Sequence, residues 1–426
     1  MDLLDYLAEI EGLTEEPDSE FYCNYSDDEE YDDEEYDEES SGILGILEAS
    51  KGRILEDVHL SSMREVNENE AEEPVCNNVD NLNKDNANRF LLIVDGSSLL
   101  STSFYGTARD LMFAKTEEQK QAAYKKLMKS SDGRYTNGVY TFMKTLLKII
   151  NEQKPSHMAI VWDVTRNSFR KTELYSDYKG TRKETPSPLK EQFKTTQELL
   201  NGVLPQFMSS LDDERIYEAD DFAGSLGKRF EEEIPCRFLS KDEDYLQLVS
   251  EYSSVYLVTS KHKELYEEMG IDREMFNLPD GVFEYTLESL EAIKELKPYQ
   301  IVDYKALCGD SSDNIPGVKG VGPKAVLPLL KEYDTVEGIY EEIEGLDEKE
   351  QKELAKFFKD ELSISRSPIK KLLEGREAAF LSKELATIKT DIPSIQELTL
   401  DSLRVDMDED LLKQKLLDLD IKSLLK

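Results

Sequence analysis

The sequence RFLLIVDG at residues 89–96 is an apolar run that ends in an acidic residue. A run of this length and composition is typical of a strand that is buried on both faces. Three later stretches repeat the pattern, namely HMAIVWD at 157–163, RIYEADD at 215–221 and PCRFLSKD at 235–242. Helical spacing between them, at residues 139–150 and 189–200, completes an alternation of strands and helices. This alternation predicts an α/β fold with a mostly parallel sheet flanked by helices.

The acidic residues at the ends of these stretches form a candidate site. Ligands of such folds bind beyond the carboxyl ends of the strands, so we expect the acids to lie at one edge of the sheet. Taken singly, an acid such as Asp220 or Asp221 is better interpreted as a helix cap. Taken together, charges ~4 Å apart repel by about 4 kcal/mol at an effective dielectric near 20, so a cluster needs cations. Oxygen ligands without histidine or cysteine favour Mg²⁺ or Mn²⁺.

A glycine-rich stretch, IVDYKALCGDSSDNIPGVKGVGPK at residues 301–324, is a second candidate site. Asp310 and Asp313 lie three residues apart, a spacing that allows both to reach one metal ion. The turn that follows is rich in glycine, which lets backbone N–H groups approach a phosphate. A solvated turn between two helices would explain this stretch equally well if it stood alone.

The composition limits the class of protein. A chain of 426 residues has room for two or three domains. It has no apolar run near the roughly 18 residues of a membrane helix, and its acidic start does not resemble a secretion signal. The four cysteines show no C-x-x-C spacing that would indicate a zinc site. We therefore expect a soluble cytoplasmic protein without a membrane partner.

The charge is distributed unevenly along the chain. The net charge is −39, of which residues 1–88 contribute −25. These residues are predicted to form a disordered, solubilising extension, which in an alternative hypothesis contacts a protein partner or screens the basic segment of its own chain. That segment, residues 166–194, holds eight basic residues against four acidic ones. It is either a nucleic-acid contact or the solvated face of an amphipathic helix.

These motifs together resemble the 5′ nuclease family, which includes the 5′-to-3′ exonuclease domain of bacterial DNA polymerase I, its stand-alone bacterial relatives and phage flap endonucleases. The motifs are VDGSS at 94–98, FR at 169–170, YKGTR at 178–182, EADD at 218–221, DED at 242–244 and GDSSDN at 309–314. The resemblance implies a PIN-like nuclease core at 89–300 with a helical arch near 165–195. It also implies a helix-three-turn-helix DNA-binding subdomain and a helical tail at 301–426.

Site residues follow from the resemblance by position. The metal carboxylates would be Asp95, Asp163, Glu218, Asp220, Asp221, Asp242, Asp244, Asp310 and Asp313. The catalytic residues of the arch would be Arg170, Tyr178, Lys179 and Arg182, with Lys179 stabilising the charge that develops on the scissile phosphate. The hairpin would bind duplex DNA without reading bases, together with a potassium ion, through Gly317, Val318, Lys319, Gly320, Val321, Gly322 and Lys324.

The chain departs from the family pattern at several places. Thr102 stands where many members have an arginine, and an insertion at residues 109–129 follows it. Lys241 replaces the glycine that usually precedes the Asp-x-Asp pair, and Pro328 lies inside the expected second helix of the hairpin motif. None of these changes removes a carboxylate of the expected metal site.

The expected function is that of a structure-selective 5′ nuclease with two or more Mg²⁺ or Mn²⁺ ions. Its substrates would be DNA with 5′ flaps or free 5′ ends, and RNA-primer hybrids, in replication or repair. One alternative is a PIN-type ribonuclease, against which the hairpin and arch motifs argue. Another alternative is a non-catalytic branched-DNA binding module, against which the complete set of carboxylates argues.

Overall fold

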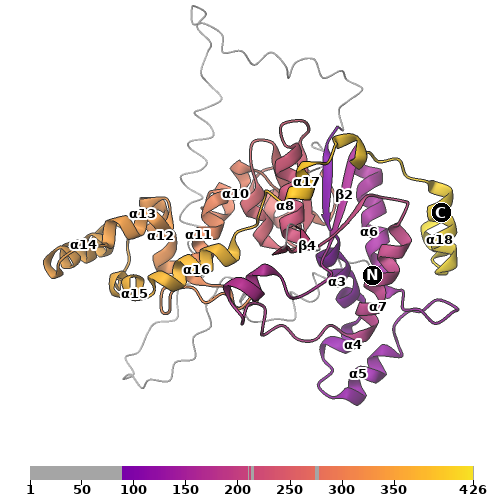
Figure 1. Cartoon of the computed structure of the whole chain (residues 1–426), viewed down its shortest axis with the longest axis horizontal. Helices are drawn as coiled ribbons and strands as arrows, with labels where there is room; N and C mark the ends of the chain where they lie inside the picture. The colour runs from indigo at the N-terminus through magenta and orange to yellow at the C-terminus, as the bar shows by residue number, and fades with distance from the viewer. Residues whose placement is uncertain (1–88, 210, 213–214, 274–277, 426) are drawn as a thin grey trace, which may run out of the picture. The chain divides into compact units, whose positions relative to one another are not determined.

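The computed structural model describes residues 89–209, 211–212, 215–273 and 278–425 (Figure 1). The acidic extension expected at residues 1–88 lies outside these ranges. A six-stranded sheet with the order β3-β2-β1-β6-β7-β8 forms the centre of the described part. Its strands are β1 (Leu91–Asp95), β2 (His157–Trp162), β3 (Gln206–Met208), β6 (Cys236–Ser240), β7 (Ser253–Val258) and β8 (Val282–Tyr285).

The sheet is parallel except for β8, which pairs antiparallel with β7. In register, Leu91 pairs with His157 on one side and with Cys236 on the other. The carboxyl ends of β1, β2 and β6 therefore lie at one edge, as expected from the sequence. A mostly parallel α/β sheet is confirmed.

The prediction that residues 215–221 form a strand of this sheet is wrong. Arg215–Ile216 (β5) pairs antiparallel with Leu211–Asp212 (β4) in a separate two-stranded sheet. Helix α8 (Ala219–Phe230) begins directly afterwards, with Glu218 as its N-cap. The extended run is only two residues long, which is below the roughly three residues of even the shortest usual strands. The acidic residues of this stretch are thus supplied by the start of a helix.

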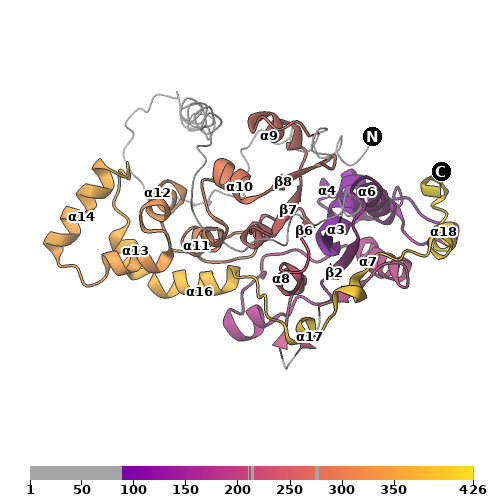
Figure 2. The same ribbon diagram turned by 90° about the horizontal axis from the view of Figure 1, so that it is seen from above.

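Helices cover both faces of the sheet because alternate residues of β1 point to opposite sides. Leu91 and Ile93 pack in one apolar cluster with α8, whereas Leu92 and Val94 pack in a second cluster with residues of α3, α6 and α7. Figure 2 shows α8 and α6 on opposite sides of the sheet. The helices of this part are α3 (Gly96–Thr107), α4 (Arg109–Met112), α5 (Glu117–Tyr124), α6 (Asn137–Gln153), α7 (Ser187–Leu200), α9 (His262–Glu268) and α10 (Leu287–Lys294).

The segment expected to form the arch, near residues 165–195, is helical only in part. A π-helical turn, Arg170–Leu174, is followed by an irregular stretch at 175–186 and then by the first half of α7. The insertion at 109–129 forms the short helices α4 and α5. Thr102 lies half-buried in α3.

The C-terminal part is helical. It consists of α11 (Pro298–Cys308), α12 (Pro323–Tyr333), α13 (Val336–Ile343), α14 (Glu348–Asp360), α15 (Ile369–Glu374), α16 (Arg376–Ala386), α17 (Pro393–Gln396) and α18 (Glu409–Asp418). As expected, Pro328 lies inside α12. Residues of α11, α12 and α13 belong to the same apolar cluster as Leu91 and Ile93 of the sheet. The sheet and the C-terminal helices are therefore joined by one continuous apolar interior.

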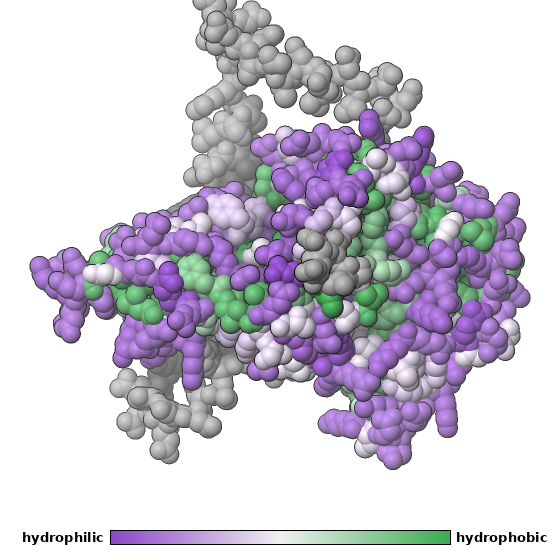
Figure 3. Space-filling model, in the orientation of Figure 1, coloured by the Kyte–Doolittle hydropathy of each residue, from purple (hydrophilic) through white to green (hydrophobic). Residues whose placement is uncertain are grey.

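One face of the described part is predominantly polar. On the face drawn in Figure 3, hydrophilic residues cover most of the described part, with smaller apolar areas between them. No helix of the described ranges is long and apolar enough to span a membrane.

Replacing Gly227 by alanine should destabilise the fold. A β-carbon at this position of α8 would overlap the ring of Phe238, with the ring atom Cε1 only 3.0 Å away. Overpacking costs typically 1–3 kcal/mol, which exceeds the gain of up to about 1 kcal/mol in helix propensity. We expect a lower midpoint in urea unfolding for Gly227→Ala. Gly322→Ala is the control, because a β-carbon there meets nothing within 4 Å. Equal midpoints for the two variants would contradict this packing.

Candidate active site

Asp95 and Asp163 mark the carboxyl ends of β1 and β2. Asp95 caps helix α3 by accepting the N–H of Ser98 at 2.9 Å, and it accepts the hydroxyl of Ser240, the last residue of β6, at 2.8 Å. Asp163 accepts the N–H of Ala219, in the first turn of α8, at 2.9 Å. These contacts bring the ends of three strands and the start of α8 together.

Acidic side chains are crowded at this edge. Burial, together with the nearby charge of Asp163, raises the pKa of Asp95 to about 6. The pKa of Asp220 lies well above its ordinary value because of burial and the nearby charges of Asp95 and Asp242. Asp220 also accepts the hydroxyl of Tyr245 at 3.1 Å. Because each acid disfavours ionisation of its neighbours, the cluster would be stabilised by added positive charge.

Lys305, in the last turn of α11, supplies positive charge at one side of the cluster. Its ammonium donates to Asp310 at 2.6 Å and is paired with Asp244. Burial raises the pKa of Asp244 to about 7. Burial opposes ionisation of Asp310 as well, but Lys305 holds the pKa of that carboxyl below its usual value. The sequence reasoning missed Lys305, whose only local signal is its position five residues before Asp310.

The basic segment supplies charge from the other side. Lys179 lies 3.1 Å from Glu218 and 3.6 Å from Asp313, and Arg182 is paired with Asp313. The Tyr178 hydroxyl donates to Glu218 at 3.1 Å and to Asp313 at 3.3 Å. Although burial opposes its ionisation, Lys179 and Arg182 lower the pKa of Asp313 to about 2. Lys179 and Arg182 thus form one network with Glu218 and Asp313, to which the Tyr178 hydroxyl also donates.

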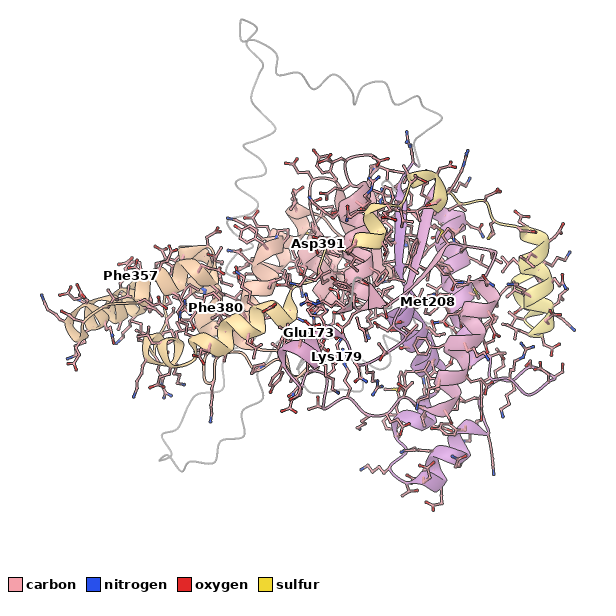
Figure 4. All side chains as sticks on the ribbon, viewed as in Figure 1. Glu173, Lys179, Met208, Phe357, Phe380 and Asp391 are labelled. Atoms are coloured by element: carbon pink, nitrogen blue, oxygen red, sulfur yellow. The ribbon has the colours of Figure 1, made fainter. Side chains whose placement is uncertain are left out.

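Lys179 is held in an uncommon backbone conformation. Its φ of 54° lies in the left-handed region, and its N–H donates to the carbonyl oxygen of Asp313 at 2.8 Å. A non-glycine residue with positive φ indicates local strain that surrounding contacts must stabilise. Figure 4 labels Lys179 and Glu173 on the segment between β2 and α7. The backbone of this segment is therefore hydrogen-bonded directly to Asp313, one of the two acids of the 301–324 stretch.

Arg170 and Asp221 form a buried pair. Two guanidinium N–H groups donate to the two carboxylate oxygens at 2.7 Å each, and others donate to the carbonyl oxygens of Leu385 at 2.9 Å and Thr387 at 2.6 Å. Asp221 also accepts the N–H of Glu218 at 2.9 Å and of Lys389 at 2.8 Å. Each oxygen of Asp221 therefore has two donors, which leaves little capacity for a metal ion.

The glycine-rich hairpin after Asp313 is anchored by its valines. Val318 and Val321 are buried, and the Val318 N–H donates to the carbonyl of Leu307 at 2.8 Å. Gly317 has a φ of 59° and its N–H donates to the Ser382 hydroxyl at 2.9 Å. Lys319 and Lys324 are exposed, and neither has an ion pair within the described residues. The hairpin thus turns apolar side chains inward and ammonium groups outward.

The carboxylates differ in their fit to a metal ion. As the side chains lie, no three acidic residues within the described ranges converge closely enough to hold one. Several of these acids are instead paired with basic side chains of the chain. Lys305 pairs with Asp244 and Asp310, Lys179 pairs with Glu218, and Arg182 pairs with Asp313. In contrast, Asp95, Asp163, Asp220 and Asp242 make no ion pair with a basic side chain of the described part. An oxygen-only set without a counterion fits a hard divalent cation such as Mg²⁺ or Mn²⁺.

Comparison with known proteins gives consistent matches. Residues 90–276 match the family model described as 5′-3′ exonuclease, N-terminal resolvase-like domain, and residues 296–410 match that described as 5′-3′ exonuclease, C-terminal SAM fold. A 5′-3′ exonuclease of Halalkalibacterium halodurans is 35% identical over 326 residues, 76% of this chain and 91% of that protein. DNA polymerase I of Streptococcus pneumoniae is 35% identical over 306 residues, 71% of this chain but 29% of that protein.

Solved structures show a weaker similarity. The phage T5 D15 protein, co-crystallised with metal ions, aligns with a TM-score of 0.48 and 19% identity over 79% of this chain and 100% of that chain.

Replacing Arg170 by alanine should cost far more stability than replacing Arg215. Both guanidinium groups lie 4.8 Å from the ring of Phe169, but Arg170 is buried against Asp221, whereas Arg215 pairs with Glu173 at the surface. Removing one partner of a buried pair costs about 3–5 kcal/mol, and an exposed pair contributes up to about 1 kcal/mol. Urea unfolding of Arg170→Ala and Arg215→Ala checks this, and similar losses would contradict the role of Arg170 as a buried clamp.

Proposed function

This chain belongs to the 5′-3′ exonuclease family, and we propose that it is a structure-selective 5′ nuclease that hydrolyses DNA with 5′ flaps or free 5′ ends. The observation that carries this proposal is the group of Asp95, Asp163, Asp220 and Asp242, which lies at the carboxyl edge of the sheet and makes no ion pair with a basic side chain of the described residues. The DNA polymerase I relatives support a role in DNA replication or repair. We include RNA-primer hybrids among the proposed substrates. We place this activity in the cytoplasm.

Divalent ions would be held by the four acids without counterions, with Glu218, Asp244, Asp310 and Asp313 around them. We assign two or more Mg²⁺ or Mn²⁺ ions, because hard cations prefer oxygen ligands. Such ions, when bound, lower the pKa of an attacking water and neutralise charge on the attacking and leaving oxygens. We do not count Asp221 among the ligands, because four N–H donors already occupy its oxygens.

The basic residues of the arch act on the substrate phosphate and on one another. Lys179 is the catalytic cation: its ammonium exchanges Glu218 and Asp313 for the scissile phosphate as charge develops there. Tyr178 contacts the same two acids, Arg182 contacts Asp313, and both residues hold these acids in place. Arg170 is a positioning residue, because it fixes Glu218 and the residues near Leu385 without reaching solvent.

The hairpin from Gly317 to Lys324 binds the duplex next to the cut. Its exposed lysines contact phosphates, so binding is independent of sequence and weakens with salt. The segment at 165–195 receives the free 5′ end. The acidic extension at 1–88 lies outside the described residues, and its contact with a protein partner or with the basic segment stays a prediction.

Cleavage of a 5′-flap DNA should require both divalent ions and the acids that lack counterions. The variant Asp220→Asn with Asp242→Asn should lower the rate about 100-fold or more, as loss of preorganised charge stabilisation does. It should not lower the unfolding midpoint in chelator, since it relieves repulsion and leaves no lysine unpaired. Full activity in the variant or in chelator would contradict the metal assignment. Faster cleavage of a matched RNA substrate would favour the PIN-type ribonuclease, and no cleavage by the native protein would favour the non-catalytic module.

Lys179→Ala should slow cleavage while leaving duplex binding nearly unchanged. One lost transition-state contact costs about 3 kcal/mol, whereas the other phosphate contacts remain. Single-turnover rates and the Kd for uncleaved duplex, measured separately, check this. Lys183→Ala is the control, because Lys183 belongs to the same segment but is exposed and contacts none of the acids. Equal losses in rate and affinity for Lys179→Ala would mean that Lys179 only binds.

A further inference from the structure

The hairpin carries a basic residue that comes from a different helix. Lys371, in α15, donates from its ammonium group to the carbonyl oxygen of Gly320 at 2.8 Å. The two residues are 51 positions apart in the sequence. Lys371 is not among the DNA-binding residues expected from the sequence, and no local motif points to it.

The hairpin is shaped to accept this side chain. Gly320 has a φ of 76°, and a β-carbon there would lie 2.9 Å from Cε of Lys371 and would overlap its ammonium. On the same side, a β-carbon at Gly375 would lie 2.7 Å from Cγ1 of Val318. Two glycines therefore allow α15 and the turn after it to pack directly on the hairpin, with the stem of Lys371 along Gly320.

The ammonium of Lys371 is available to an anion. Lys371 is exposed and has no ion pair within the described residues, whereas the adjacent Lys370 lies 3.8 Å from Glu374. An ammonium has three donors, and the Gly320 carbonyl uses one of them. Lys319 and Lys324 add two further ammonium groups on the hairpin that form no ion pair with the described part of the chain. This concentration of unpaired positive charge stands out in a chain with a net charge of −39.

We propose that Lys371 is a phosphate-binding residue of the duplex site and the resident cation of the hairpin, so that duplex binding does not require a potassium ion. A carbonyl oxygen repels a phosphate unless a cation lies between them. The Lys371 ammonium contacts the Gly320 carbonyl oxygen and has further donors for a phosphate. The proposal rests on the proposed function, because it assumes that the hairpin binds duplex DNA.

Duplex binding by the full-length chain tests the proposal. The Kd for a labelled duplex of arbitrary sequence is measured in chelator, in KCl and in tetramethylammonium chloride at equal ionic strength, for the native chain, Lys371→Met and Lys370→Met. We expect the native Kd to be the same in both salts. Lys371→Met should weaken binding about 10-fold in tetramethylammonium chloride and lower the slope of log K against log salt by about one. KCl should restore part of the loss.

The controls separate the possible failures. Lys370→Met should bind within about 2-fold of the native chain, and Lys371→Arg should retain most of the affinity. The proposal would be overturned if Lys371→Met bound the duplex with the same affinity and the same salt slope as Lys370→Met. A native Kd that differs between KCl and tetramethylammonium chloride would overturn it as well. A native chain that binds no duplex in either salt would instead refute the proposed function of the hairpin. Equal unfolding midpoints of the two methionine variants exclude misfolding as the cause of a loss.

Discussion

The crowding of carboxylates at the carboxyl edge of the sheet is the constraint on which the rest of the structure depends. Asp95 and Asp220 resist ionisation because they are buried next to other acids. A protein can hold such a group in its ionised form only if cations are brought to it, either from its own chain or from solution. The described part of the chain uses its own cations for some of these acids and leaves others without one.

The basic residues that pair with these acids come from distant elements. Their ion pairs therefore connect the sheet, the basic segment and the hairpin. Lys305 links Asp244, after β6, to Asp310, at the start of the hairpin. Lys179 and Arg182 link the basic segment to Asp313. Because Val318 and Val321 anchor the hairpin in the same apolar cluster as the sheet, the acidic edge and the proposed duplex site are held at a fixed separation. A fixed separation is what a nuclease needs if it is to cut at a set distance from a duplex.

The basic segment shows why a count of charges does not define a surface. Read as sequence, residues 166–194 form a basic stretch in an acidic protein. In the fold, Arg170 is buried against Asp221 and Lys179 against Glu218, whereas Lys183, Lys190 and Lys194 remain exposed. Only the exposed residues contribute to an electrostatic surface for nucleic acid. The buried ones hold the acids in place, and Arg170 also fixes the chain near Leu385.

The sequence by itself determined the parallel sheet, the convergence of its acidic ends and the glycine hairpin. Each is encoded locally, by apolar runs that end in an acid or by glycines that adopt positive φ, as Gly317 and Gly320 do. Only the tertiary structure decided that Arg215 and Ile216 belong to a separate two-stranded sheet. It also decided which acids form ion pairs with basic side chains of the described residues. The partners are far apart in the chain: Arg170 and Leu385 are separated by 215 residues, and Lys371 and Gly320 by 51. Such pairings depend on how complete elements pack, which no local pattern records.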